Sequence, residues 1–433
     1  MAGLTLDGAI RLMTDAGCTR LLVKVLSAND NSKNQIYLGS SFRTLHLLPG
    51  RGIVQAPGNR KWKQALDLAW IDSAGRTEVA PGSQLVLYPQ FPEVRFSGFL
   101  RGCKTAPSDL LRGRTEGRVL LLGIHPSMGI LAHTLMIGAR AAEQVGRLGG
   151  GPTGVLVDVP LAQATPGGSA RAKLLQRLGV IHRKQWIPAW RLTSSGTPTP
   201  CLGTNCGGYT LEAELGVRPN GYPEPDFLGW EVKQHAVTNF ASISVGALTL
   251  MTPEPRAGVY ANAGPEVFLR KYGYPDERNH GRINFSSPHY INRKSSRTGL
   301  ILTLRGYERS KRRMEPLGAI ELVDDKGNVA AGWPLASIID HWTRKHTQAV
   351  YAPSRHRKDP VSEYQYGPTV RLGEGTEPTR LLDALLDGCV YYDPGLKLEH
   401  ANTRTPRLKR RNQFRIGSGK LARLYRRFDE VSV

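Results

Sequence analysis

The sequence predicts two domains, an all-β-rich barrel or pseudobarrel at the N-terminus and an α/β domain after it. Its 433 residues are enough for two or three hydrophobic cores. Residues 1 to about 110 contain short apolar runs separated by Gly, Pro, Asn and Asp, which is typical of short strands joined by turns. A stretch rich in Gly, Pro and Ser between residues 149 and 170 is suited to a boundary. We therefore expect domains at residues 1–160, including a connector, and at residues 165–433.

Each expected element rests on a local pattern. The strands of the first domain are expected in the apolar runs RLLVKVL, QIYLG, WKQALDLAWID, SQLVLYP and VRFSGFL. Residues 119–147 are expected to pass from a strand into a helix. The segment AKLLQRLGVIHRKQWIPAW predicts an amphipathic helix that leads into the second domain, and residues 210–217 predict a shorter helix. The second domain then mixes basic loops with strands such as SISVGALTLM and GLILTLRGY.

The charge balance points to a polyanionic partner. Lysine and arginine number 58 against 36 aspartates and glutamates, which gives a formal net charge of +22. Such a field attracts polyanions, and nucleic acid is the leading candidate. A basic protein of the membrane surface is the alternative, but it requires an amphipathic helix with a lysine-rich face, and we find no convincing one.

The cysteines and the apolar segments indicate the compartment. Five cysteines, at positions 18, 103, 201, 206 and 389, form no CxxC pair. Their number and spacing favour a reducing compartment over a disulfide scaffold or a zinc ribbon. The N-terminal segment is amphipathic and mildly acidic, and no segment approaches the length of uninterrupted apolar sequence that crosses a membrane. We therefore expect a cytoplasmic protein without a membrane segment.

The stretch PEPDFLGWEVKQH, residues 223–235, predicts a candidate active site. In a strand, Glu231 and Lys233 point to one face, and Trp230 and Val232 point to the other. Asp226 falls between a proline and a glycine, so a bend or hairpin there would bring its oxygens close to those of Glu231. Two carboxylates and a lysine suit a magnesium-dependent attack on phosphate. The alternative is an ordinary solvated strand face.

Two further segments support this interpretation. Glu212 and Glu214 lie on the helix expected at residues 210–217, where one of them could add a carboxylate, although many helix glutamates are merely solvated. Near the C-terminus, a tract dense in arginine contains side chains suited to base edges in the major groove, namely Arg411, Asn412, Gln413 and Arg415. Phe414, Ile416 and Leu424 are interleaved with them, which indicates a packed segment rather than a loose basic tail.

The second domain resembles the MvaI/BcnI family of restriction endonucleases. The resemblance is carried by D226-x4-E231-x-K233, by HRKQWIP and GGYTLE before it, and by KRRNQFRI after it. It implies an α/β restriction-endonuclease-like PD-(D/E)xK fold with a mixed sheet. It also implies that Asp226 and Glu231 bind Mg2+, that Lys233 positions or activates the attacking water, and that Glu212 is ancillary. The implied enzyme is a monomer that cleaves double-stranded DNA at a short CC-x-GG site, such as CCWGG, beside a cognate DNA methyltransferase.

The first domain resembles the EcoRII-N family of DNA-binding effector domains. KVLSANDNSKNQIYLG and YPQFPEVRFSGF are similar to the two DNA-contacting arms of that family. The resemblance assigns one arm to Lys24, Ser27, Asn29, Asp30, Asn31, Lys33 and Gln35, and the other to Gln90, Glu93 and Arg95. An effector domain joined to a nuclease domain implies a type IIE arrangement, in which a second copy of the DNA site is bound. Read alone, NDNSKN is also an ordinary polar turn.

Two other functions share these features. A non-catalytic DNA-binding regulator would have the same charge and the same arms, with the Asp/Glu/Lys stretch only a solvated hairpin. A repair or recombination nuclease would use the same chemistry but would prefer DNA structure over sequence. Metal-dependent cleavage excludes the regulator, and a discrete set of fragment ends excludes the structure-specific nuclease.

Overall fold

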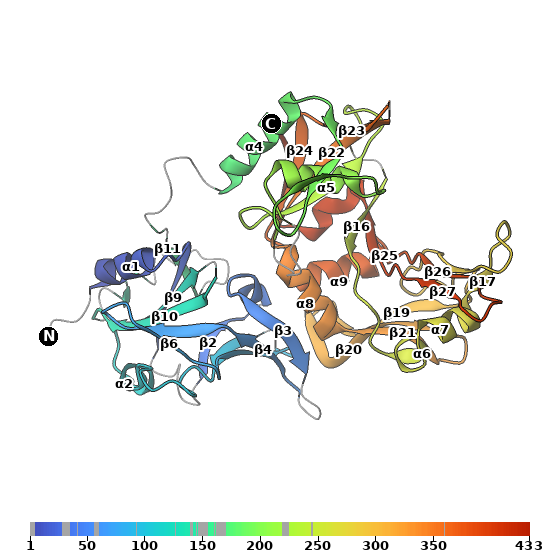
Figure 1. Cartoon of the computed structure of the whole chain (residues 1–433). Coiled ribbons are helices and arrows are strands. Elements are labelled where there is room, and N and C mark those ends of the chain that lie inside the picture. The colour runs from blue at the N-terminus through green and yellow to red at the C-terminus, as the bar shows by residue number, and fades with distance from the viewer. Residues whose placement is uncertain are drawn as a thin grey trace. The chain divides into compact units, whose positions relative to one another are not determined.

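The computed structural model divides the chain into two compact units, each of which is described by itself. One unit comprises Met1–Gly168 with Ser310–Pro316, and the other comprises Ser169–Arg309 with Leu317–Val433. The structure describes residues 5–27, 35–40, 42–55, 60–91, 93–125, 127–138, 142–143, 145, 155–159, 161, 170–218, 225–243, 246–358 and 360–433. Figure 1 labels the elements. None of the helices among these residues has the length and apolar character that a membrane crossing requires.

The first unit is rich in β-structure, as the sequence predicts. Its helical elements are α1 (Leu6–Asp15), η1 (Phe42–His46) and α2 (Ser108–Arg112). One sheet has the strand order β11-β1-β9-β10-β5-β6. Its strands are β1 (Arg20–Val25), β5 (Leu68–Ile71), β6 (Thr77–Val79), β9 (Arg118–His125), β10 (Gly129–Met136) and β11 (Val157–Val159). The second sheet has the order β2-β8-β7-β4-β3. Its strands are β2 (Gln35–Gly39), β3 (Gly50–Gln55), β4 (Trp62–Leu66), β7 (Gln84–Tyr88) and β8 (Glu93–Ser97).

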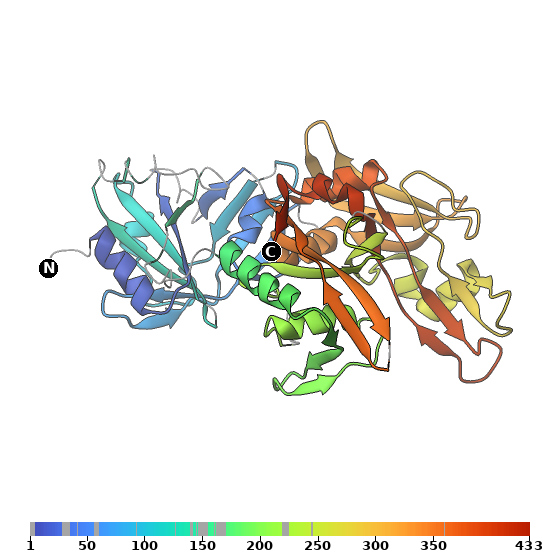
Figure 2. The same ribbon diagram turned by 90° about the horizontal axis from the view of Figure 1, so that it is seen from above.

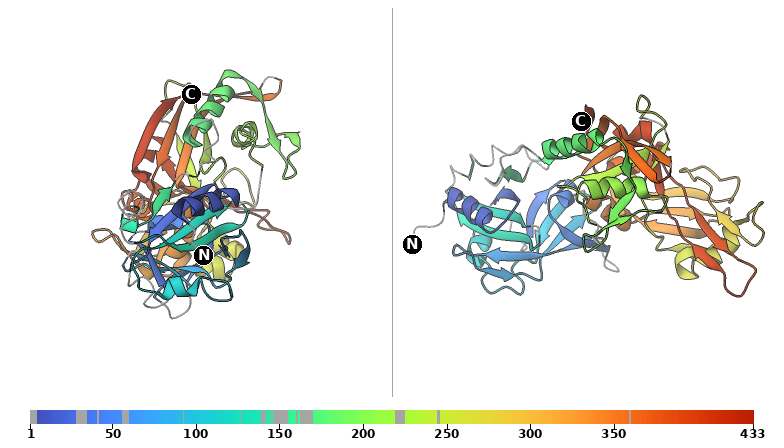
Figure 3. Two further views of the ribbon diagram at one scale, coloured as in Figure 1. Left: turned by 90° about the vertical axis from the view of Figure 1, so that its left-hand side faces the viewer. Right: turned by 45° about the horizontal axis from the view of Figure 1, so that its top comes forward.

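Neither sheet of this unit closes into a barrel in the part of the chain that the structure describes, because each strand order has two ends. Helix α1 covers the first sheet, and its buried Ala9 and Met13 pack in one core with Leu121 of β9 and Leu131 of β10. The dark blue α1 is seen along this sheet in Figure 3. The expected barrel is therefore observed as two open sheets, one of them covered by a helix.

The helix expected after the first strand of residues 119–147 is wrong over residues 129–136, while the described residues 142, 143 and 145 are helical. Residues 129–136 form β10, which pairs antiparallel with β9 through partners such as Gly129 and His125. The strand is buried along most of its length. A strand buried on both faces shows a continuous apolar run, which its pattern does not distinguish from a buried helix.

The second unit is a mixed sheet with helices and several smaller sheets. The main sheet has the order β12-β23-β22-β24-β29, and β15 pairs with β22. Its strands are β12 (Ile187–Pro188), β15 (Glu231–Ala236), β22 (Gln348–Lys358), β23 (Ser362–Tyr366), β24 (Thr369–Glu374) and β29 (Arg427–Ser432). The β15–β22 pair is parallel, whereas β22 runs antiparallel to β23 and β24. The helical elements are α4 (Ala170–Arg183), α5 (Cys206–Glu214), α6 (Gly258–Asn262), α7 (Pro265–Tyr272), α8 (Leu335–Lys345), α9 (Pro378–Leu386) and η2 (Ser418–Leu424).

The smaller sheets of the second unit are β13-β14, β16-β28-β25, β17-β18-β26-β27 and β19-β20-β21. Their strands are β13 (Trp190–Leu192), β14 (Pro198–Pro200), β16 (Ala247–Met251), β17 (Tyr274–Pro275), β18 (Ile283–Phe285), β19 (Ile301–Glu308), β20 (Arg313–Val323), β21 (Val329–Pro334), β25 (Val390–Tyr392), β26 (Leu396–Glu399), β27 (Arg407–Lys409) and β28 (Phe414–Gly417). Within β20, the residues from Leu317 onward belong to this unit. The arginine-rich C-terminal tract thus forms strands and a short helix, and Phe414, Ile416 and Leu424 are buried as expected.

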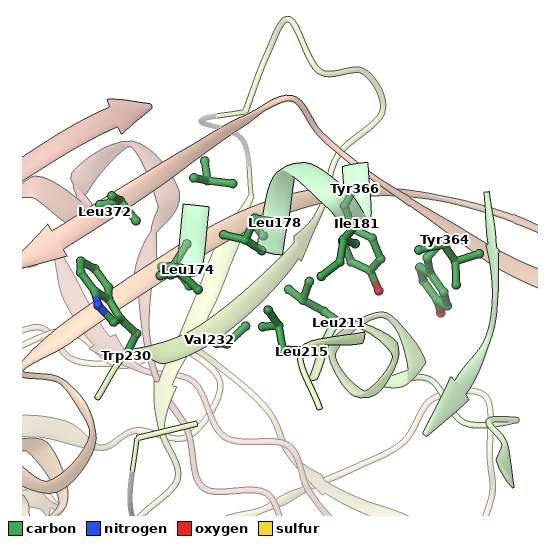
Figure 4. Packing of buried hydrophobic residues seen from close by; sticks show 14 of the residues in the cluster. Leu174, Leu178, Ile181, Leu211, Leu215, Trp230, Val232, Tyr364, Tyr366 and Leu372 are labelled. Carbon is green, nitrogen blue, oxygen red and sulfur yellow. The ribbon is translucent and has the colours of Figure 1, made fainter. Parts of the chain in front are cut away.

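One face of the main sheet is covered by α4 and α5. Leu174 and Leu178 of α4 and Leu211 of α5 pack with Trp230 and Val232 in one buried cluster (Figure 4). Both helices, drawn in green, lie against these strands in the view from above (Figure 2). The helix expected at 172–190 is observed as α4 only up to Arg183, because residues 187–188 and 190–192 form β12 and β13, and the helix expected at 210–217 overlaps α5. The apolar faces of α4 and α5 bury one side of the strand that carries the candidate site.

A local disulfide corrects the expectation that the cysteines are reduced. Cys201 and Cys206 are bonded to each other, with a sequence separation of 5. Cys206 is the first residue of α5, so the bond ties the start of this helix to the segment that follows β14. The number and spacing of the cysteines do not indicate that the chain turns between Cys201 and Cys206 and brings their sulfur atoms together. The link is local and does not form a disulfide scaffold.

Glycine at position 207 lets α5 approach the sheet closely. A Cβ atom at Gly207 would lie 2.9 Å from a ring carbon of Tyr364 and 3.0 Å from the side chain of Gln234 in β15. The hydroxyl of Tyr366 donates a hydrogen bond to the carbonyl oxygen of Gly207, at 2.7 Å. Gly208, the next residue of the helix, has open space around the same position. The contact of α5 with β15 therefore depends on the absence of a side chain at residue 207.

We expect Gly207→Ala to destabilise the protein by about 1–3 kcal/mol, because the added methyl group displaces packed side chains. The matched change Gly208→Ala should be neutral or slightly stabilising, since alanine favours a helix over glycine by up to about 1 kcal/mol. Urea unfolding of both variants measures the difference. Equal effects of the two substitutions would contradict the close approach at Gly207.

Candidate active site

Strand β15 carries a carboxylate and a lysine on one face and core residues on the other. Val232 belongs to the buried cluster with Trp230, which comes directly before the strand. Glu231 and Lys233 point to the opposite face, and the Lys233 Nζ donates a hydrogen bond to Glu231 Oε1 at 2.7 Å. This arrangement confirms the predicted alternation. Because the core fixes one face of the strand, it also fixes where the charged pair points.

Asp226 is brought beside this pair by a tight turn. Phe227 and Trp230 exchange both backbone hydrogen bonds, at 3.0 and 2.9 Å. The two residues between them, Leu228 and Gly229, have φ angles of 48° and 84°. Two successive positive φ angles are typical of a two-residue hairpin turn. The turn folds the chain back, so that Asp226 Oδ2 accepts a hydrogen bond from the Val232 backbone N–H at 2.9 Å. The predicted bend at Asp226 is therefore present.

The two glutamates of α5 have different environments. Glu214 is held by structural contacts, because the Lys184 Nζ lies 2.6 Å from its Oε2 and the Trp190 Nε1 donates to its Oε1 at 3.0 Å. Glu212 instead interacts electrostatically with Asp226 and Glu231. The structure thus brings Glu212 toward the candidate site, together with Asp226, Glu231 and Lys233.

Burial and mutual repulsion shift the pKa values of these carboxyl groups. Burial, together with the negative charges of Asp226 and Glu231, raises the pKa of Glu212 to about 7. Burial and the charge of Glu231 raise the pKa of Asp226 to about 6. Burial also disfavours ionised Glu231, but nearby positive groups, Lys233 first, outweigh it and lower the pKa of Glu231. The site therefore brings three carboxyl groups together where they are partly shielded from water.

Lys345 is a site residue that the sequence analysis missed. It is the last residue of α8, and its Nζ lies 3.8 Å from Glu231 Oε2. The next residue, His346, is buried, stacks on Trp342 and bonds through Nε2 to the Leu250 carbonyl oxygen at 3.1 Å. Burial lowers the pKa of His346 to about 3. Neither residue belongs to a recognisable motif, and only the packing of α8 brings them to β15.

His235, on the same strand face as Lys233, is a structural residue. Its ring is buried, and its Nε2 donates to the Ile243 carbonyl oxygen at 3.0 Å. Burial is the main cause that lowers the pKa of His235 to about 4. The His235 ring is thus used inside the fold.

The carboxylates suit a hard divalent cation bound by few protein ligands. Within the described ranges, His, Cys, Asp and Glu side chains form no group of three or more that could hold a metal ion. Glu231 Oε2 is nevertheless buried and has no hydrogen-bond partner. Magnesium typically takes one or two protein carboxylates and completes its shell with water and substrate phosphate. Asp226 and Glu231 fit this requirement.

The C-terminal tract presents only some of its expected base-contacting side chains. Asn412 is buried, with its Nδ2 donating to the Tyr260 hydroxyl at 3.0 Å and its Oδ1 accepting from the Tyr392 hydroxyl at 2.6 Å. Its amide is thus used inside the fold, so the predicted base contact of Asn412 would require both bonds to break. Arg411 is exposed, while Gln413 and Arg415 are partly exposed. Arg415 pairs with Asp393 at 2.7 Å.

Three described residues of the two N-terminal arms, Gln35, Glu93 and Arg95, lie on the paired strands β2 and β8. Gln35 begins β2 and accepts a hydrogen bond from the Tyr88 hydroxyl at 3.4 Å. β2 pairs with β8, where Arg95 forms an ion pair with Glu93 and lies over the Tyr88 ring at 5.6 Å. Among the remaining arm residues, Gln90 is partly exposed and Ser27 is exposed.

One arm residue is not available to a ligand in this structure. Lys24 is buried in β1, where its Nζ donates to the Val25 carbonyl oxygen at 3.2 Å, so the predicted DNA contact would require the Lys24 side chain to leave this position. A lysine in an otherwise apolar strand gives no sequence signal of its burial. The predicted contacts at Asn29, Asp30, Asn31 and Lys33 lie outside the described residues.

The chain is similar to known nucleases over its second unit. The model of the MvaI/BcnI restriction endonuclease family matches residues 175–425. A solved structure of the restriction endonuclease MvaI with cognate DNA is 18% identical, covers 61% of this chain and 98% of its own, and has a TM-score of 0.46. MvaI in the absence of DNA is 17% identical over the same shares, with a TM-score of 0.35. None of the curated protein sequences matches the chain.

The raised pKa of Glu212 predicts a pH-dependent effect of neutralising it. The pKa of Glu212 in the folded protein, about 7, lies above the ordinary value of 4.5. Folding therefore favours protonated Glu212. The stability that this protonation contributes is complete below about pH 4.5 and is lost as the pH rises through 7. In metal-free buffer, Glu212→Gln should therefore change stability little at pH 5 and should stabilise the protein at pH 8, by on the order of 2 kcal/mol.

Urea unfolding at both pH values measures this difference. The matched control is Glu214→Gln on the same helix, which removes charge from a glutamate paired with Lys184 and should destabilise the protein at both pH values. An effect of Glu212→Gln that is the same at pH 5 and pH 8 would contradict the buried like-charge cluster.

Proposed function

Because the chain belongs to the MvaI/BcnI restriction endonuclease family and is a site-specific DNA endonuclease, we propose that it is a type II enzyme that uses Mg2+ to hydrolyse double-stranded DNA at a CC-x-GG site, CCWGG in particular. The observation that carries the proposal is the arrangement on β15. There Glu231 is paired with Lys233 at 2.7 Å, and Asp226 is folded back onto the same strand. A solvated strand face would not bury these charges together.

Each site residue has a proposed role. Asp226 and Glu231 hold the magnesium ion, with Glu212 as an ancillary carboxylate. When bound, Mg2+ supplies Lewis-acid stabilisation of the negative charge that develops on the scissile phosphate. Lys233, whose ammonium group is fixed by Glu231, orients the attacking water and balances the same developing charge. The protein provides a partly desolvated setting, in which these electrostatic interactions are stronger than in water.

DNA contacts in this unit are proposed for the accessible part of the C-terminal tract. Arg411 is exposed and suited to phosphate or guanine. Gln413 accepts a hydrogen bond from the Thr249 hydroxyl at 2.8 Å through Oε1, which fixes its amide while Nε2 can donate to a base. Arg415 is oriented by Asp393. Phosphate contacts supply most of the affinity, and these side chains supply the sequence preference.

The first unit is proposed to bind a second copy of the DNA site. Support comes from the neighbouring positions of Gln35, Glu93 and Arg95 on paired strands, and from the resemblance of both arms to the EcoRII-N effector domains. The combination resembles the type IIE enzyme UbaLAI. We further propose that the enzyme acts as a monomer in the cytoplasm, beside a cognate DNA methyltransferase that protects the host's own sites.

Removing the site lysine should separate binding from cleavage. We expect Lys233→Ala to lose cleavage of plasmid DNA in Mg2+ by at least about a hundredfold, because the developing charge and the attacking water lose their partner. Retardation of a DNA fragment on a gel should change little. The control is Lys184→Ala, which removes a lysine that pairs with a structural glutamate.

Sequencing the fragment ends tests the wider proposal in the same experiment. Uniform ends at one short motif support a restriction enzyme and identify its site. Dispersed ends would favour a structure-specific nuclease. Cleavage by Lys233→Ala at the wild-type rate would place the active site elsewhere, and an intact but retarded plasmid with the wild-type protein would favour a regulator.

The effector role of the first unit predicts a response to DNA added in trans. An oligonucleotide carrying the site should change the rate at which the wild-type enzyme cuts a plasmid with a single site. Arg95→Ala should remove that response and leave the basal rate unchanged, because Arg95 lies in the first unit. The control is Arg76→Ala, which removes an arginine paired with Asp72 on the other sheet of this unit. A response that persists in Arg95→Ala would argue against this arm as the second DNA site.

A further inference from the structure

The two oxygens of Glu231 face two different lysines. Lys233 Nζ lies 2.7 Å from Oε1, and Lys345 Nζ lies 3.8 Å from Oε2. Oε2 is buried and has no hydrogen bond, so its nearest described cation is an ammonium group beyond hydrogen-bond distance. Oε1 of Glu231 is therefore hydrogen-bonded to an ammonium group, whereas Oε2 has only a more distant ammonium group near it.

The two lysines also differ in their freedom to move. Lys233 lies within β15, and its side chain is 18% exposed. Lys345 is the last residue of α8, and its side chain is 35% exposed. A lysine at a helix C-terminus interacts favourably with the helix dipole. Lys345 is thus more exposed than Lys233 and lies farther from Glu231, so less is lost when it turns to solvent.

The charges at the site favour such a movement when a divalent cation binds. Glu212, Asp226 and Glu231 carry three negative charges when all are ionised, and Lys233 and Lys345 carry two positive charges, which leaves a net charge of −1 (−3 + 2). A divalent cation would make this sum +1 if both lysines stayed. Like charges a few ångströms apart in a partly desolvated site repel strongly. Withdrawal of one ammonium group restores neutrality.

We propose that Lys345 is a charge-balancing residue, which holds Glu231 Oε2 in the metal-free protein and releases it when a divalent cation binds. Lys345 thereby sets the cation affinity of the site, and it is a positioning residue rather than a catalytic one. This inference rests on the proposed metal-dependent function. It differs from the role of Lys233, whose ammonium stays on Oε1 throughout. A merely structural ion pair would stabilise the fold without affecting cation binding.

The test is the affinity of the full-length protein for Ca2+, measured by calorimetry without DNA. Ca2+ is a hard cation with oxygen ligands and reports binding apart from catalysis. We expect Lys345→Met to bind Ca2+ about tenfold more tightly than the wild type, because a competing positive charge has been removed. Lys345→Gln, measured in parallel, provides a second neutral variant in case the methionine variant fails to fold.

Two controls define the effect. Lys345→Arg keeps the charge and should keep the wild-type Ca2+ affinity. Lys184→Met removes a lysine that pairs with Glu214 of α5 at 2.6 Å, and it should leave the affinity unchanged. A gain in affinity that appears in Lys184→Met as well would reflect net charge alone and would overturn the assignment to Lys345.

Plasmid cleavage in Mg2+ by the same wild-type preparation separates this inference from the proposed function. If the wild type cleaves DNA but the neutral Lys345 variants bind Ca2+ with equal or lower affinity, the role of Lys345 is overturned and the function stands. If the wild type neither cleaves DNA nor binds Ca2+, both proposals fail. Tighter binding by the neutral variants, with the arginine variant unchanged, supports the inference.

Discussion

The pairing of Lys233 with Glu231 is the interaction on which the site depends. Burial alone would favour a protonated glutamate, but the adjacent ammonium group keeps Glu231 ionised and aims one of its oxygens. The pair is held in place from behind, because Trp230 and Val232 alternate with it and pack into the cluster formed by α4 and α5. Core packing and the geometry of the candidate site thus depend on opposite faces of the same strand. A shift of β15 by one residue would exchange them and would destroy both.

Much of this could be predicted from the sequence, because the decisive information is local. Strand alternation places Glu231 with Lys233, and the small turn residues before them predict the return of Asp226. The helices expected at residues 172–190 and 210–217 likewise overlap α4 and α5, although their ends differ. In contrast, Lys345 reaches Glu231 only because α8 packs near β15, and no local pattern encodes that contact. The same holds for the choice between Glu212 and Glu214, which depends on Lys184 and Trp190.

Sequence patterns did not distinguish a buried polar residue from an exposed one, or a buried strand from a buried helix. Asn412 stands among arginines and resembles a base-reading side chain, yet the hydroxyls of Tyr260 and Tyr392 use its amide inside the fold. Lys24 similarly lies within an apolar strand that buries it. The run over residues 129–136 has the composition of a buried element of either type, and pairing with β9 decides for a strand. In each case the deciding factor is the packing or pairing around the segment, which its composition does not encode.

The turn at Leu228 and Gly229 has a consequence for how the site forms during synthesis. The bond between Asp226 and Val232 closes a loop of a few residues, which forms rapidly and needs no other part of the chain. Helix α8 is translated much later, and its arrival requires long-range packing. A nascent chain can therefore pair Asp226 with its strand before Lys345 exists. Completion of the charge pattern around Glu231 is therefore coupled to completion of the fold.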